Sequence, residues 1–146
     1  MKNIFLADDD ADDRMFFEEA LKEVSIPTEL TTSNDGVELM NTLETYVTEP
    51  PPPHIIFLDL NMPRKTGLDC LLEIKRLPHL QDIAIAIYST SSSEKDIEET
   101  FVQGANIYIK KPHDFDTLKK TLKEVITINW QYHTSGLNRD NFLLSI

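Results

Sequence analysis

Residues 55–63 read Ile-Ile-Phe-Leu-Asp-Leu-Asn-Met-Pro, and this stretch decides the fold. The apolar run from Ile55 to Leu58 indicates a strand buried on both faces, because a half-exposed strand would alternate with polar residues. Asp59 follows this run directly. A carboxylate at the end of a buried strand is either a turn former or a functional group, so the residues that end the other strands become informative.

Four more strand-like segments occur, at 4–7, 28–33, 83–88 and 107–109. Between and after them, apolar residues recur at helical spacing, for example at Phe17, Ala20, Leu21 and Val24. Strand and helix therefore alternate five times, which predicts an α/β fold with a five-stranded parallel sheet and helices on both faces. A common order of such sheets, 2-1-3-4-5, places the three most apolar strands, the first, third and fourth, in the middle.

Polar residues stand at four of the predicted strand ends. They are Asp8-Asp9-Asp10, Asp59, Ser89-Thr90 and Lys110-Lys111. Ligands of such sheets bind beyond the carboxyl ends of the strands, so these side chains are expected to converge. Clustered carboxylates repel one another unless a cation compensates, and Mg²⁺ takes oxygen ligands together with water and phosphate. With a lysine and a hydroxyl nearby, the pattern predicts a Mg²⁺-dependent phosphoryl-transfer site.

Each of these residues also has a purely structural interpretation. Acids that precede a helix often cap it, and we favour that interpretation for Asp10, Asp12 and Asp13, while it stays open for Asp8 and Asp9. Asp59 could form a turn, the Ser89 hydroxyl could bond the backbone, and Lys111 could be solvated. Their joint occurrence at the strand ends favours the functional interpretation.

The overall composition limits the possible partners. The chain has 146 residues, enough for one domain, and a net charge of −11 with a pI near 4.7. This charge argues against binding to nucleic acid or to anionic membranes. Cys70 is the single cysteine, so no internal disulfide is expected. No apolar stretch approaches the roughly 18 residues of a membrane span, and the start is too polar for a signal peptide, so we expect a cytoplasmic protein.

The ordered set of motifs resembles the response-regulator receiver domain over about residues 1 to 128. The residues that carry the resemblance are Asp8-Asp9, Asp59-Leu60-Asn61-Met62-Pro63, Gly67, Ser89, Gly104-Ala105, Tyr108 and Lys111-Pro112. The resemblance implies the flavodoxin-like (βα)5 fold. The overall form is also similar to small single-domain regulators of the chemotaxis type and to those that pair with phytochrome-type sensor kinases.

The resemblance also implies a role for each matching residue. Asp59 would accept a phosphoryl group from a histidine of a sensor kinase, hybrid or phytochrome-type kinases being candidates. Mg²⁺ would be held by Asp8, Asp9, Asp59 and the backbone carbonyl of Asn61. Lys111 would pair with the phosphoryl oxygens, and Ser89 and Tyr108 would form the switch pair. The readout face would be the fourth helix, fifth strand and fifth helix, and the chain would catalyse only its own phosphorylation and dephosphorylation.

Residues 1–130 are predicted to form the receiver domain and residues 131–146 a C-terminal extension that is too short to be a separate output domain. The output is then a downstream protein target, a phosphorelay step or self-association. The apolar end of the chain, residues 142–146, packs either on its own domain or against a second copy in a homodimer or a partner protein. The proline-rich loop 48–53 has no clear role. Thr90 stands where receivers often have a small residue, which would narrow access to Asp59.

Two other functions are compatible with the same acids. One is a phosphatase that forms an aspartyl-phosphate intermediate, but such enzymes carry an acid two residues after the nucleophile, where this chain has Asn61. The other is a degenerate receiver that acts only as a binding module. A nucleotide-binding site is weaker still, because three acids stand where a glycine-rich phosphate loop would be.

Overall fold

The computed structural model describes residues 1–45, 52–128 and 142–144. It contains one parallel sheet in the order β2-β1-β3-β4-β5-β6. Its strands are β1 (Lys2–Ala7), β2 (Thr28–Ser33), β3 (Ile55–Leu58), β4 (Ala84–Ser89), β5 (Ile107–Lys110) and β6 (Leu143–Leu144). The predicted order of the first five strands is confirmed, and β6 adds a short strand beyond β5.

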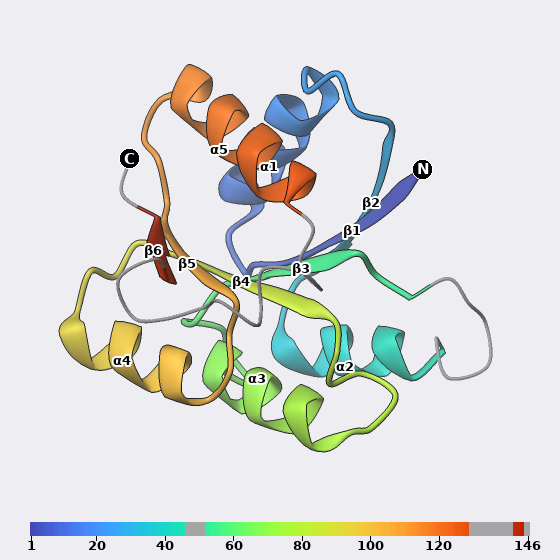
Figure 1. Cartoon of the computed structure of the whole chain (residues 1–146), viewed down its shortest axis with the longest axis vertical. Coiled ribbons are helices and arrows are strands. Elements are labelled where there is room, and N and C mark those ends of the chain that lie inside the picture. Colours follow the sequence, from blue (N-terminus) through green and yellow to red (C-terminus); the bar gives the residue numbers. More distant parts are fainter. Residues whose placement is uncertain (46–51, 129–141, 145–146) are drawn as a thin grey trace.

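Five helices cover the two faces of this sheet. They are α1 (Ala11–Lys22), α2 (Gly36–Glu44), α3 (Gly67–Arg76), α4 (Glu94–Val102) and α5 (Phe115–Thr127). Helices α1 and α5 lie together on one face, and α2, α3 and α4 lie on the other (Figure 1). None of the helices in the described part of the chain is both long and apolar enough to cross a bilayer.

The central strands are buried on both faces, as their apolar runs predict. In β3, Phe57 packs toward α1 and forms an edge-on pair with Phe17 at 5.0 Å between ring centroids. Its neighbours Ile56 and Leu58 belong to the other core, against α2 and α3. This alternation follows the period of two in a strand and gives the domain two cores, one on each side of the sheet.

The helices begin at polar capping residues that fix where each loop ends. Asp10 caps α1 by accepting hydrogen bonds from the backbone N–H groups of Asp12 and Asp13. The capping interpretation of Asp10 is therefore correct. Ser93 caps α4 by accepting a hydrogen bond from the backbone N–H of Asp96. Because α1 begins so soon after β1, the acids between them are held at the end of the strand.

Residues 142–144 lie against their own domain. Phe142 is fully buried, with its ring 5.2 Å from Phe101 of α4 and 6.2 Å from Tyr108 of β5. Leu143 then pairs in parallel with Tyr108 in the sheet. For residues 142–144 the self-packing alternative is therefore correct. Residues 48–51 of the proline-rich loop, and the extension at 131–141 and 145–146, lie outside the described residues.

Candidate functional site

The pairing of β1 with β3 brings the acids of two distant segments together. Ala7 is in register with Leu58, and the backbone N–H of Asp59 donates to the carbonyl of Ala7 at 3.0 Å. Carboxylate oxygens of Asp8, Asp9 and Asp59 all lie within 4.8 Å of one another. The convergence expected from the strand ends is therefore present, and it forms a compact cluster of three carboxylates, which we call the acid cluster.

Burial makes the acid cluster electrostatically unfavourable without a cation. Asp8 is fully buried and Asp59 is 5% exposed, whereas Asp9 is exposed. The pKa of Asp59 is raised to about 6, chiefly by burial and in smaller part by the nearby charge of Asp8, while the charge of Lys111 acts in the opposite direction. The buried oxygen Oδ2 of Asp8 has the Lys111 ammonium 2.8 Å away as a charged partner. An oxygen-rich, negatively charged cluster of this kind fits a hard divalent cation such as Mg²⁺.

Lys111 brings a positive charge to the acid cluster from the end of β5. Its ammonium nitrogen lies 2.8 Å from Asp8 Oδ2 and 3.4 Å from Asp59 Oδ2, and the side chain is only 9% exposed. Its backbone N–H donates to the carbonyl of Ser89 at 2.8 Å, which fixes where the side chain starts. Burial lowers the pKa of Lys111, but the surrounding carboxylates outweigh it and raise the pKa above the usual value. The solvated-lysine interpretation is therefore wrong.

Asp13 is a member of the site that the sequence interpretation missed. Its Oδ2 lies 2.8 Å from the Lys111 ammonium and hydrogen-bonds to it. The capping interpretation describes only part of its role, since Asp13 does sit in the first turn of α1. Helical spacing gave no signal for this role, because Asp9 lies before the N-cap Asp10 and outside α1. The contact with Lys111 spans 98 residues of sequence and could not be read from local spacing.

The two predicted switch residues, Ser89 at the end of β4 and Tyr108 in β5, both contact Ser91. Ser89 is fully buried and its hydroxyl accepts a hydrogen bond from the N–H of Ser91 at 3.1 Å, as the structural interpretation proposed. Tyr108 is also fully buried, and its hydroxyl donates to the carbonyl of Ser91 at 2.9 Å. The two side chains thus share Ser91 as a neighbour. Thr90, which lies between Ser89 and Ser91 in the sequence, is exposed.

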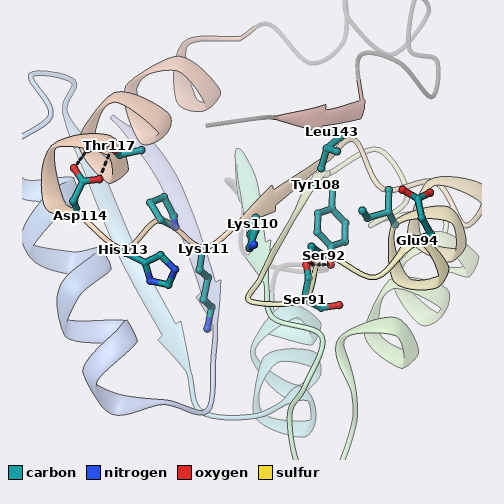
Figure 2. Close-up of a pocket in the computed structure, with 12 residues that line it drawn as sticks. Ser91, Ser92, Glu94, Tyr108, Lys110, Lys111, His113, Asp114, Thr117 and Leu143 are labelled. Atoms are coloured by element: carbon teal, nitrogen blue, oxygen red, sulfur yellow. Dashed lines mark hydrogen bonds between the residues drawn. The ribbon is translucent and has the colours of Figure 1, made fainter.

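A cavity of about 450 Å³ adjoins Tyr108 and the end of β5. Tyr108, Leu143, Lys110 and Lys111 are among the residues that line it. Figure 2 shows Tyr108 on the α4 side of β5 next to Leu143, while Lys111 extends from the end of β5 in a different direction. Lys111, which follows β5, and Tyr108 within β5 therefore both line the cavity, but their side chains extend in different directions.

The loop after Asp59 is constrained by a glycine. The N–H of Gly67 donates to the carbonyl of Leu60 at 3.0 Å, and a Cβ atom at Gly67 would collide with the backbone carbonyl of Asp59. Asn61 is exposed, and its N–H makes a long hydrogen bond of 3.4 Å to Asp59 Oδ1. Gly67 thus lets α3 start close to the acid cluster, and the carbonyl role of Asn61 remains a prediction.

Comparison with known proteins points to a single family. The family model described as the response regulator receiver domain matches residues 4–123. Response regulator Rcp1 of Synechocystis sp. strain PCC 6803 is 32% identical over 126 residues, covering 85% of this chain and 86% of Rcp1. The phosphorylated cyanobacterial phytochrome response regulator RcpA is similar in structure, with a TM-score of 0.77, 36% identity and coverage of 85% and 90%. The Mn²⁺-bound form of Rcp1 has a TM-score of 0.75 at 33% identity, with coverage of 86% and 91%.

Proposed function

The chain belongs to the response-regulator receiver family, and we propose that it accepts a phosphoryl group on Asp59 from a sensor histidine kinase. The observation that carries the proposal is the acid cluster with Lys111 beside it. Family membership supports a role in two-component signalling. The chemical role proposed for each residue rests on the geometry of this chain.

Asp59 is the nucleophile of the proposed reaction. A carboxylate oxygen attacks the phosphorus of a phosphohistidine, the new P–O bond forms as the P–N bond breaks, and the imidazole leaves. The product is an acyl phosphate on Asp59. The attack requires the ionised carboxylate, and the pKa of about 6 leaves most of Asp59 ionised at neutral pH.

Asp8, Asp9 and Asp59 would hold Mg²⁺, with the backbone carbonyl of Asn61 as a further ligand. When bound, Mg²⁺ would offset negative charge on the carboxylates and on the phosphoryl oxygens. The Mn²⁺-bound form of the similar protein Rcp1 supports a divalent ion here. Lys111 supplies a further positive charge that is already within 3.4 Å of the reacting carboxylate.

We expect the phosphoryl group to act through Ser89 and Tyr108. Phosphorylation adds about −1.5 to −2 charge and several acceptor oxygens. Ser89 and Lys111 would gain a partner that exists only in the phosphorylated state, and only such a differential interaction can shift a conformational equilibrium. Tyr108 lies beside Ser91 and Phe142, so a movement of the Ser89 loop would reach the surface formed by α4, β5 and α5.

The partners are inferred from the comparisons. RcpA is described as a phytochrome response regulator, which supports a phytochrome-type histidine kinase as the phosphodonor. A downstream protein would read the phosphorylated state. A homodimer remains a prediction, but Phe142 does not support it because this ring is buried in its own domain.

Phosphorylation can be tested directly with acetyl phosphate and Mg²⁺, followed by intact mass spectrometry. We expect a gain of one phosphoryl group that requires Mg²⁺ and is absent from Asp59→Asn. Transfer from candidate histidine kinases, with the same variant as control, would identify the donor. If wild-type protein never gains phosphoryl mass, the degenerate-receiver alternative would replace this proposal. Steady release of phosphate from many phosphomonoesters would instead favour the phosphatase alternative, which the comparisons do not support.

A further inference from the structure

Lys111 has more carboxylate partners than the proposed reaction requires. Its ammonium lies 2.8 Å from Asp8, 2.8 Å from Asp13 and 3.4 Å from Asp59. The two shorter contacts are to residues of the β1–α1 region, and the longest is to the proposed phosphoacceptor. In this arrangement the ammonium is held nearer to Asp8 and Asp13 than to Asp59.

Asp13 differs from the other two partners in one respect. Asp8 and Asp59 belong to the acid cluster, so a bound cation would take up part of their charge. Asp13 is outside the acid cluster, and among the described residues its side chain forms a hydrogen bond and an ion pair with Lys111. Its position is fixed because its N–H donates to the capping carboxylate of Asp10 at 3.1 Å. The pull of Asp13 on Lys111 would therefore persist when the cation binds.

We propose that Asp13 is a positioning residue that draws Lys111 away from Asp59 and thereby slows phosphorylation. The inference rests on the proposed function and adds a residue that lowers the rate of phosphorylation. Two effects of Asp13 act in the same direction. The ion pair holds the ammonium away from the incoming phosphoryl oxygens, and the carboxylate adds negative charge close to an anionic phosphodonor.

The sequence offers a matched control in the neighbouring residue. Asp12 is in the same first turn of α1 and carries the same charge, but it is exposed and forms no ion pair with Lys111. Asp12→Asn and Asp13→Asn remove the same charge from the same helix end. Any difference between them reports the contact with Lys111.

The test measures the rate of phosphorylation of Asp59 by acetyl phosphate at saturating Mg²⁺. Asp13→Asn should raise the rate by about two- to fivefold over Asp12→Asn, the size expected for one partly exposed ion pair. Asp13→Glu, which restores the carboxylate, should return the rate toward wild type. The excess rate of Asp13→Asn should persist in high salt, whereas the effect of Asp12→Asn should be screened.

Three outcomes would overturn the inference. Equal rates in the two Asn variants would show that only general charge matters, and a slower Asp13→Asn would show that Asp13 assists Lys111. Mg²⁺ affinity, measured by calorimetry without any phosphodonor, provides the third. A much larger loss of affinity in Asp13→Asn than in Asp12→Asn would place Asp13 among the metal ligands. Failure of the proposed function would look different, because wild-type protein would then not be phosphorylated at all.

Discussion

Replacing Asp59 with Asn should stabilise the folded protein in metal-free buffer. Asp59 is 5% exposed, and its pKa is raised from 3.8 to about 6, chiefly by burial. Each pKa unit corresponds to about 1.4 kcal/mol, so the charged form of Asp59 costs the folded state up to about 3 kcal/mol at neutral pH. Asn has nearly the same shape and no charge, so Asp59→Asn should recover a large part of that cost.

The pH dependence gives this prediction a characteristic form. Because the pKa is higher in the folded state, folding retains a proton on Asp59 that the unfolded chain loses between about pH 4 and pH 6. The free energy of unfolding of wild-type protein should therefore fall, relative to Asp59→Asn, as the pH rises through this window. The difference should be small at pH 4 and reach its maximum above pH 6.

Urea denaturation followed by circular dichroism, at several pH values and with a chelator present, measures this difference. Asp12→Asn serves as the control, because Asp12 is exposed at a helix N-terminus and its loss should cost at most about 1 kcal/mol. Added Mg²⁺ should stabilise wild type more than Asp59→Asn and so narrow the gap. An Asp59→Asn variant that is no more stable than wild type at pH 7, or a gap that does not change with pH, would refute the reasoning.

Three further predictions test other parts of the structure. Gly67→Ala should lower the free energy of unfolding by about 1–3 kcal/mol and weaken Mg²⁺ binding in a calorimetric titration, because the new Cβ would collide with the carbonyl of Asp59. Unchanged stability and affinity would contradict the close approach of Gly67 to Asp59. Phe142→Ala should lower the free energy of unfolding in urea by about 3 kcal/mol and speed hydrogen exchange in β5, since the ring is fully buried. No change in either would mean that residues 142–144 do not dock. Cys70 is buried, and burial raises the pKa of its thiol to about 12. The thiol should therefore not react with a disulfide reagent at pH 8 until the protein is unfolded. Rapid reaction of native protein would count against this burial.

The central part of the fold could be predicted from the sequence because its signals are local. The run from Ile55 to Leu58 coincides with β3, and the weaker segment 28–33 coincides with β2. Continuous apolar runs identify strands that are covered on both faces. Once the strand order is known, the topology itself brings Asp8 and Asp59 together, since the carboxyl ends of parallel neighbours lie at one edge.

The contacts of long side chains could not be predicted in the same way. Lys111 contacts three carboxylates, and which three depends on how its flexible chain crosses from the end of β5 to the start of α1. The sequence predicts Asp13 to be a helix-terminal acid, and this prediction is correct for its position in α1. It does not reveal the contact with Lys111. Sequence spacing specifies the face of a helix, but it does not specify what lies opposite that face.

The end of the chain shows the same limit on a larger scale. Apolar residues at 142–144 indicate burial, but composition cannot say whether the surface that covers them belongs to the same chain or to another copy. The structure supplies the reason for self-packing: without β6, β5 would be an edge strand with unpaired backbone groups. Because Phe142 also contacts Phe101 and Tyr108, a protein that binds by adding a strand to β5 must first displace the chain's own residues. The free energy of that displacement is subtracted from the affinity of any such partner, so the stability of this short segment limits binding at the edge of β5.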